Sequence, residues 1–357
     1  MVRRGGPAPL AARDSVLSLL PSLASRSALA ARVPRLLPLA LLGGAAAFLA
    51  FRRMRRAAAA AAFWQTLSRG KLLEGVCPPA LADALVREMQ RCLDAAELPL
   101  SQTHLLRRRH ARAACAELQA AGGGEGRGGR AAALRKVAVA ASPNFKDVLR
   151  ARVLASPHFG ALQLLCQRLV HHHLLPFLRD GLGEDSFAVQ CQPSMRFNLP
   201  GCSALGARPG DSDEMIGLHA DGEYGHQPGE MNFTLALTPF FGSNGLFVET
   251  EPGRGDFREV VMDTGGIFAF AGVSRRHHNK RNTTGVSRVS LDFRVIPMSK
   301  YQDSRDGERK ASREHRFTLG EYFELVVVGR NNTTVTTGRG LIFRTDEVGS
   351  PQRKLQN

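Results

Sequence analysis

Two histidines and one aspartate, His219, Asp221 and His277, have the residue types and the spacing of a metal centre. Two imidazoles and one carboxylate hold non-heme Fe(II) on one face and leave positions open for a co-substrate and O2. His219 and Asp221 lie two residues apart, so on an extended strand both side chains project to the same side. The pattern predicts an iron-dependent oxygenase in which His277 arrives from another part of a sheet.

From about residue 186 onward, the sequence has the short alternating patterns of β-strands. Strands are predicted over 187–198 (one or two), 231–241, 246–250, 257–262, 266–273 and 286–297, each bounded by Gly, Pro, Asp or Asn. Short strands in such succession are typical of an all-β double-sheet jelly roll, which would bring His277 back beside His219. Apolar residues spaced three and four apart over 63–183 predict supporting helices.

The residues around the three candidate ligands resemble those of a known family. The block from His219 to Asn232 and the later blocks 276–282 and 284–294 are similar to the 2-oxoglutarate/Fe(II)-dependent oxygenase superfamily. Within it, the chain is most similar to the small streptomycin-biosynthesis-type branch, a distant relative of phytanoyl-CoA and prolyl hydroxylases. The likeness covers residues 190–301, about a third of the chain. It implies a mainly β protein with a double-stranded β-helix (jelly-roll) core and an N-terminal helical region.

The resemblance also implies roles for particular residues. His219, Asp221 and His277 would bind Fe(II), and 2-oxoglutarate would chelate the metal through its keto-acid end. In the family, a basic residue on the last strand holds the distal carboxylate. Arg288, eleven residues beyond His277, is the first candidate, because a guanidinium takes a carboxylate in two parallel hydrogen bonds. Arg294 has the same side-chain parity and is the second candidate, or a partner for the keto-acid end.

The implied reaction consumes O2 and 2-oxoglutarate and releases succinate and CO2 while a C–H bond of the substrate is oxidised. Hydroxylation is the expected outcome, although desaturation and ring formation use the same ligands and stay open. A small-molecule substrate is expected, and a protein side chain remains an alternative.

Further polar residues are candidates for contacts to the substrate or to the metal ligands: Tyr224, His226, Glu230, Asn232 and Arg196. The first four are alternatively explained as residues that satisfy backbone groups in a tight loop. Arg196, together with Asn198, would lie on an earlier strand at the cavity mouth or form a surface ion pair.

Other histidines are given no role. Only one of His277 and His278 can face the metal, and we favour His277 because the family's ligand directly follows Arg276. The run from His171 to His173 is not expected to bind metal, since neighbours on a helix point in different directions.

Two other classes of function remain as alternatives. A membrane-anchored binding module would keep the barrel without turnover, but all three ligands and the arginine are present. A zinc or manganese hydrolase could use the same triad, but it would have no need of Arg288. A halogenase would lack the carboxylate to make room for halide, whereas Asp221 is present.

The charge and the cysteines exclude some partners. The net charge is +16, but residues 1–56 hold ten arginines and one acid, Asp14, so most of the excess lies in the N-terminus and no nucleic-acid partner is expected. The six cysteines include no Cys-x-x-Cys pair, which argues against a zinc site and a disulfide framework.

Residues 1–62 are predicted to be a targeting or membrane-anchor segment. An apolar run over 36–51 is followed by four arginines, and it is a little shorter than the roughly 20 residues that usually cross a membrane. We favour a single-pass anchor. The Arg-rich, acid-poor composition would also suit mitochondrial or plastid import.

The predicted organisation is therefore an N-terminal segment (1–62), a helical support region (63–183), the oxygenase core (184–300) and a C-terminal extension (301–357). A last helix is expected over 317–328. The segment 320–323 only partly resembles the Gly- and Tyr-rich end of the family, so the sequence assigns no role to the extension.

Overall fold

The computed structural model describes residues 44–120, 134–136, 138–139, 145–205, 210–302, 317–329, 333–336 and 342–344. The chain divides into two compact units, Met1–Arg55 and Arg56–Asn357, and the second contains the predicted core and all candidate site residues. Helix α1 (Gly44–Ser68) begins in the first unit and ends in the second.

None of the helices in the described part of the chain combines the length with the apolar character that a membrane span requires. Half of the apolar run over 36–51, residues 36–43, lies outside the described residues.

The helical region folds as predicted into several helices: α2 (Pro79–Cys92), α3 (Leu105–Ala120), α5 (Phe145–Ala155), α6 (Phe159–Leu169) and α7 (Leu175–Leu182), with a π-helical turn at Val170–Leu174 between the last two. In α2, Leu81, Leu85 and Met89 recur every four residues and are buried, so one face of the helix packs on the core. Helix α7 ends at Gly183, whose left-handed conformation (φ +68°) caps the helix.

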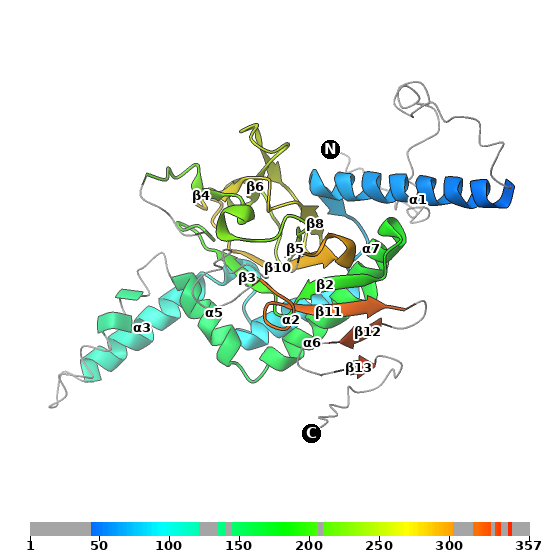
Figure 1. Ribbon diagram of the computed structural model, residues 1–357. Coiled ribbons are helices and arrows are strands. Elements are labelled where there is room, and N and C mark those ends of the chain that lie inside the picture. The colour runs from blue at the N-terminus through cyan, green and yellow to red at the C-terminus, as the bar shows by residue number, and fades with distance from the viewer. Residues whose placement is uncertain are drawn as a thin grey trace, which may run out of the picture. The chain divides into compact units, whose positions relative to one another are not determined.

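The larger sheet has the order β1-β8-β5-β10-β2-β11-β12-β13, with every neighbouring pair antiparallel (Figure 1). Its strands are β1 (Lys71–Leu73), β2 (Ser186–Gln190), β5 (Met231–Ala236), β8 (Ile267–Phe270), β10 (Arg288–Pro297), β11 (Phe323–Val328), β12 (Thr333–Thr336) and β13 (Ile342–Arg344). A further strand, β3 (Ser194–Asn198), pairs with the first half of β10.

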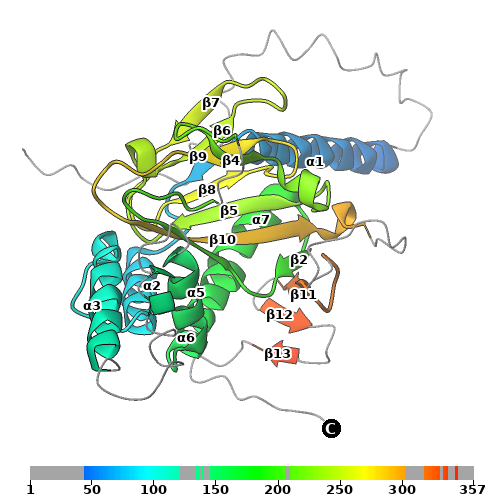
Figure 2. The same ribbon diagram turned by 90° about the vertical axis from the view of Figure 1, so that its left-hand side faces the viewer.

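The smaller sheet has the order β4-β9-β6-β7 and is also antiparallel: β4 (Ile216–His219), β9 (His277–Asn279), β6 (Leu246–Glu249) and β7 (Phe257–Val260). From β4 to β10 the chain passes back and forth between the two sheets, as a jelly roll requires. The predicted fold class is confirmed. Figure 2 shows the smaller sheet on one side of β5, β8 and β10, and helices α2, α3, α5 and α6 on the other.

Two segments outside the predicted core add strands to its larger sheet. Residues 71–73 of the helical region form the edge strand β1. The helix predicted over 317–328 is wrong, because Phe323–Val328 forms β11 and pairs with β2. The run Val326-Val327-Val328 is β-branched and suits a strand, and the open edge of β2 supplies the backbone partners that the sequence alone does not reveal.

Candidate metal centre

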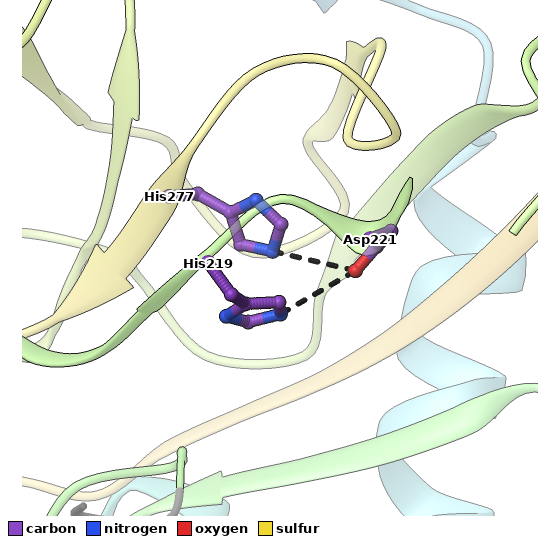
Figure 3. Close-up of side chains that lie close together, drawn as sticks. All are labelled: His219, Asp221 and His277. Carbon is purple, nitrogen blue, oxygen red and sulfur yellow. Dashed lines mark ion pairs between the residues drawn. The ribbon is translucent and has the colours of Figure 1, made fainter. Parts of the chain in front are cut away.

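His219, Asp221 and His277 meet at one point, as predicted (Figure 3). Nε2 of His219 lies 3.4 Å from Oδ1 of Asp221, and Nε2 of His277 lies 3.7 Å from the same oxygen. One ligand atom from each residue lies within 4.8 Å of the other two. Two donors bound to one ion at roughly 2 Å are at most about 4 Å apart, and both distances to Oδ1 are within that limit.

The two sheet strands and one turn bring these side chains together. His219 ends β4 and pairs directly with His277, the first residue of β9, so the strand register places the two imidazoles side by side. Ala220 continues in an extended conformation, and Asp221 begins a 3-10 turn, where its N–H donates to Gly272 O at 2.8 Å. The His-x-Asp spacing therefore converges on one side, as expected for an extended segment.

Backbone carbonyls fix the tautomer of both imidazoles. Nδ1 of His219 lies 2.6 Å from Gly217 O, and Nδ1 of His277 lies 3.1 Å from Arg275 O. A carbonyl oxygen can only accept, so Nδ1 carries a proton in each ring and Nε2 is the nitrogen available to a metal. Both Nε2 atoms face Asp221, which is the arrangement of metal-binding histidines held by a carbonyl behind them.

The carboxylate of Asp221 is held from its other side. Oδ2 accepts from Asn232 Nδ2 at 2.6 Å and from Arg294 Nη2 at 3.2 Å, while Oδ1 faces the two imidazoles. Burial alone would raise the pKa of Asp221, but the charge of Arg294 and the contact with His219 outweigh it and lower the pKa well below its usual value. Asp221 is therefore an ionised candidate ligand, with Oδ1 directed at the two imidazoles.

Burial also lowers the pKa of His277, to about 4, although the nearby Asp221 opposes this shift. The ring is neutral at physiological pH and can donate its lone pair. His278 lies outside the cluster, stacked on Phe247 (ring centroids 5.2 Å apart) and edge-on to Phe257 (4.7 Å). His278 is therefore a packing residue between two strands of the smaller sheet.

A cavity opens beside His277, and the inward face of β10 forms one wall of it. Alternate residues of this strand line the cavity: Arg288, Ser290, Asp292 and Arg294. As predicted, Arg288 and Arg294 lie on the same face of β10, but the groups that they contact differ.

Arg288 is a buried cation, 3% exposed, without a carboxylate in contact among the described residues. Its Nε has no hydrogen-bond partner, and its guanidinium lies over the Phe240 ring, 4.6 Å from the centroid. Burial lowers the pKa of Arg288 to about 10, so the charge persists at neutral pH. Ser290, two residues along the same face, also has a buried hydroxyl without a partner.

Arg294 has partners on three sides. In addition to Asp221, its Nε lies 2.8 Å from Glu230 Oε1, and its Nη1 donates to the Tyr322 hydroxyl at 2.9 Å. Burial by itself would lower the pKa of Arg294, but the neighbouring carboxylates raise it. Unlike Arg288, this guanidinium is occupied by protein groups.

The remaining candidate residues, Tyr224, His226 and Arg196, lie in three different parts of the site. Tyr224 is 46% exposed, with its ring edge-on to His219 and the centroids 5.1 Å apart. His226 contacts the carboxylate of Glu230 at 2.9 Å, and the same carboxylate lies beside Arg294. Arg196 lines the cavity and is paired there with Asp292 at 2.8 Å, so it combines the cavity position with an ion pair, which were expected as alternatives.

Sequence reasoning did not nominate Ser290, Tyr322 or Phe317. Ser290 could have been found from its parity with Arg288 on one strand face. Phe317 stacks on His226 with ring centroids 3.7 Å apart, and Tyr322 reaches Arg294 from a segment that was expected to be helical. Only the fold brings these two aromatic residues to the site.

The fold and this cluster define a class of protein: a double-sheet jelly roll with two histidines and one aspartate converging at the edge of its cavity. In known proteins this donor set, with open positions, is typical of non-heme Fe(II) oxygenases.

No family model matches the sequence. The chain is similar to the streptomycin biosynthesis protein StrG of Streptomyces griseus, with 34% identity over 148 residues, which are 41% of this chain and 64% of StrG. The match spans just under two thirds of that relative. It confirms the resemblance to the streptomycin-biosynthesis-type branch.

Two solved structures have a more remote likeness. EctD from S. alaskensis with bound Fe is 14% identical, covering 41% of this chain and 60% of its own, with a TM-score of 0.30. An oxidoreductase of the 2OG-Fe(II) oxygenase family from Burkholderia pseudomallei is 18% identical, covering 44% of this chain and 63% of its own, also with a TM-score of 0.30. At these scores the likeness carries no weight, and the fold rests on the strand topology.

Proposed function

We propose that the protein is an Fe(II)- and 2-oxoglutarate-dependent dioxygenase that oxidises, and by expectation hydroxylates, a C–H bond of its substrate. The observation that carries this proposal is the position of Arg288. A buried, unpaired guanidinium lines the same cavity as His277, one of the three candidate metal ligands.

The three ligands fit Fe(II). Two imidazoles with Nε2 directed at the cluster and one ionised carboxylate are donors that non-heme Fe(II) accepts, and they occupy only one face of an octahedral ion. The protonated Nδ1 atoms and the hydrogen bonds to Asp221 hold all three donors before metal arrives. The remaining positions would face the cavity and accept a chelating co-substrate and O2.

The cavity fits a dicarboxylate that is bound at one end by the metal and at the other by Arg288. A buried charge without a counter-charge costs several kcal/mol, so an arginine in this position indicates an anionic ligand. Arg288 Nε and Ser290 Oγ are both buried donors without partners on one face of β10. Together they would hold the distal carboxylate of 2-oxoglutarate with charged and neutral hydrogen bonds.

Fe(II), 2-oxoglutarate and O2 supply the oxidising chemistry when they are bound, and the protein supplies binding, orientation and exclusion of water. Asn232 and Arg294 keep Asp221 oriented, and the apolar side chains of Leu246 and Phe270 line the cavity beside the polar groups. The lining thus combines apolar surface with a few polar groups, as pockets for small molecules do. We propose a small-molecule substrate that binds in this cavity beside His277.

The alternatives lack such support. A hydrolase built on the same three ligands would leave the buried charge of Arg288 unexplained, and so would a binding module that takes no anion. No described feature favours either class over the oxygenase.

The proposal is tested by adding Fe(II) and then 2-oxoglutarate to the full chain without O2, while recording the visible metal-to-ligand charge-transfer band. We expect a band in the wild type. In Arg288→Met we expect the 2-oxoglutarate concentration at half-saturation to rise at least about tenfold, the loss of one charged hydrogen bond. Arg152→Met, on the exposed face of α5, is the control and should behave as wild type.

Admission of O2 should then yield succinate in proportion to the 2-oxoglutarate consumed. A wild type that gives neither band nor succinate would overturn the proposal. A band that is unchanged in Arg288→Met would instead overturn the role of Arg288.

A further inference from the structure

The side chain of Arg294 lies between two buried carboxylates and a phenol. Its Nη2 donates to Asp221 Oδ2 at 3.2 Å, its Nε lies 2.8 Å from Glu230 Oε1, and its Nη1 donates to Tyr322 Oη at 2.9 Å. A guanidinium is planar and its donors form a rigid fork, so the hydrogen bonds from Nη1 and Nη2 define its orientation, while the contact of Nε with Glu230 is an ion pair without hydrogen-bond geometry. Because Nη2 donates to Oδ2 of Asp221, the orientation of Arg294 in turn helps to fix the orientation of the Asp221 carboxylate.

Tyr322 comes from the C-terminal extension, immediately before β11, and this segment is fastened to the core. The Gln227 amide donates to Phe317 O at 2.9 Å, and the N–H of Leu319 donates to the hydroxyl of Tyr301 at 2.9 Å. The Tyr322 ring packs edge-on against Phe317, with centroids 4.8 Å apart. The hydroxyl of Tyr322 is therefore presented to Arg294 by a segment packed beside the site.

We propose that Tyr322 is a positioning residue for the metal ligand Asp221 and acts through Arg294, so that the segment 317–328 is part of the metal centre. Without the phenol, Nη1 of Arg294 loses its partner, and the guanidinium can turn toward Glu230. The carboxylate of Asp221 then loses one of its two donors on Oδ2 and is free to rotate away from the imidazoles. Partners that orient a metal ligand typically change affinity by about 10-fold to 100-fold when they are removed.

This inference rests on the proposed function only in requiring that the three ligands bind a metal. It does not depend on 2-oxoglutarate or on turnover. The test therefore uses Co(II) alone as the probe, because its visible spectrum reports the number and geometry of its ligands.

The experiment compares the Co(II) dissociation constant and absorption spectrum of the full-length wild type with those of Tyr322→Phe. Tyr301→Phe is the matched control, because it also removes a phenol hydroxyl that fastens the same segment but does not touch Arg294. We expect Tyr322→Phe to weaken Co(II) binding about tenfold and to shift its absorption bands. Tyr301→Phe should bind and absorb as wild type, even if its melting temperature falls by a similar amount.

A double-mutant cycle tests whether the effect passes through Arg294. Lysine at this position keeps the charge but cannot contact Asp221, Glu230 and Tyr322 together, so in the Arg294→Lys background Tyr322→Phe should have no further effect on Co(II) affinity. If Tyr322→Phe does not fold, Tyr322→Leu, which is smaller and also lacks the hydroxyl, serves in its place.

Two results overturn the inference. Either Tyr322→Phe binds Co(II) as tightly and with the same spectrum as wild type, or its effect is additive with Arg294→Lys. If the wild type itself binds no Co(II), the three residues do not form a metal site, and both the proposed function and this inference are wrong. The two failures are thereby distinguished.

Discussion

The side-chain amide of Asn232 donates to Oδ2 of Asp221 at 2.6 Å and leaves Oδ1 directed at the two imidazoles. Without this bond the carboxylate would be held by Arg294 alone. We expect Asn232→Ala to weaken Fe(II) binding by about 10-fold to 100-fold, measured by anaerobic titration. Asn198→Ala is the control, because it removes a buried amide that donates to Asn244 O, away from the ligands. Equal Fe(II) affinity in the two variants would contradict the orienting role of Asn232.

Because Gly272 has no side chain, there is room beside it for the hydrogen bond between Asn232 and Asp221. A Cβ at this position would lie 2.4 Å from Asn232 Nδ2 and 2.9 Å from Asp221 Oδ2, so the two side chains must separate. Gly272→Ala should therefore lower both the melting temperature and the metal affinity. Gly160→Ala in α6 is the control, since no atom lies within 4 Å of its added methyl. If Gly272→Ala binds metal as tightly as Gly160→Ala, the added methyl group can be accommodated without separating Asn232 from Asp221, and the prediction is wrong.

Local patterns were enough to predict that His219, Asp221 and His277 would come together, and where β5, β6, β7, β8 and β10 lie. The His-x-Asp spacing needs only one extended residue, and apolar or β-branched runs bounded by Gly, Pro, Asp or Asn identified those strands. The short strands β4 and β9, which carry the two histidines, were not predicted. The position of Tyr322 depends on long-range pairing, because its partner Arg294 lies on β10 and the strand β2 intervenes between β10 and β11. For the same reason, the sequence could not show that Phe323–Val328 would join an open sheet edge rather than form a helix.

The two arginines of β10 show the same limit. Parity placed Arg288 and Arg294 on one face, which the structure has. Parity does not show which guanidinium meets a carboxylate of the protein and which stays unpaired. That distinction depends on Glu230 and Asp221, which reach Arg294 from other segments.

The unpaired charge of Arg288 should make the ligand-free protein less stable than it could be. Arg288→Met keeps a long side chain over the Phe240 ring and removes a buried charge without a partner. We expect the free energy of unfolding of the ligand-free protein to rise by roughly 1 to 3 kcal/mol, measured in urea. With Fe(II) and saturating 2-oxoglutarate the order should reverse, because only the wild type gains the full energy of ligand binding. A ligand-free variant that is less stable than wild type would argue that Arg288 has a structural partner.

Glu249 should make stability depend on pH in the acid range. Burial would raise the pKa of its side chain, but hydrogen bonds from Arg276 and from the N–H groups of Gly255 and Gly253 lower the pKa from 4.5 to about 2. Because the folded pKa is the lower one, the stabilisation is fully present above about pH 4.5 and is lost as the pH falls toward 2.

Urea unfolding of the wild type and of Glu249→Gln at pH 6 and pH 3 measures this effect. At pH 6 the variant should be less stable by about 2 kcal/mol, the value of charged hydrogen bonds in a buried setting. At pH 3 the difference should be smaller. A difference that is the same at both pH values would contradict an ionised Glu249 clamped by Arg276.

The most direct test of the account is the stoichiometry of Fe(II) binding, measured by anaerobic titration of the full chain and its histidine variants. His277 faces Asp221, whereas the adjacent His278 packs between Phe247 and Phe257. We predict one Fe(II) per chain in the wild type and in His278→Phe, and loss of binding by at least about 100-fold in His277→Ala. If His277→Ala binds Fe(II) like the wild type, or if His278→Phe alone loses it, the three-residue centre described here is contradicted.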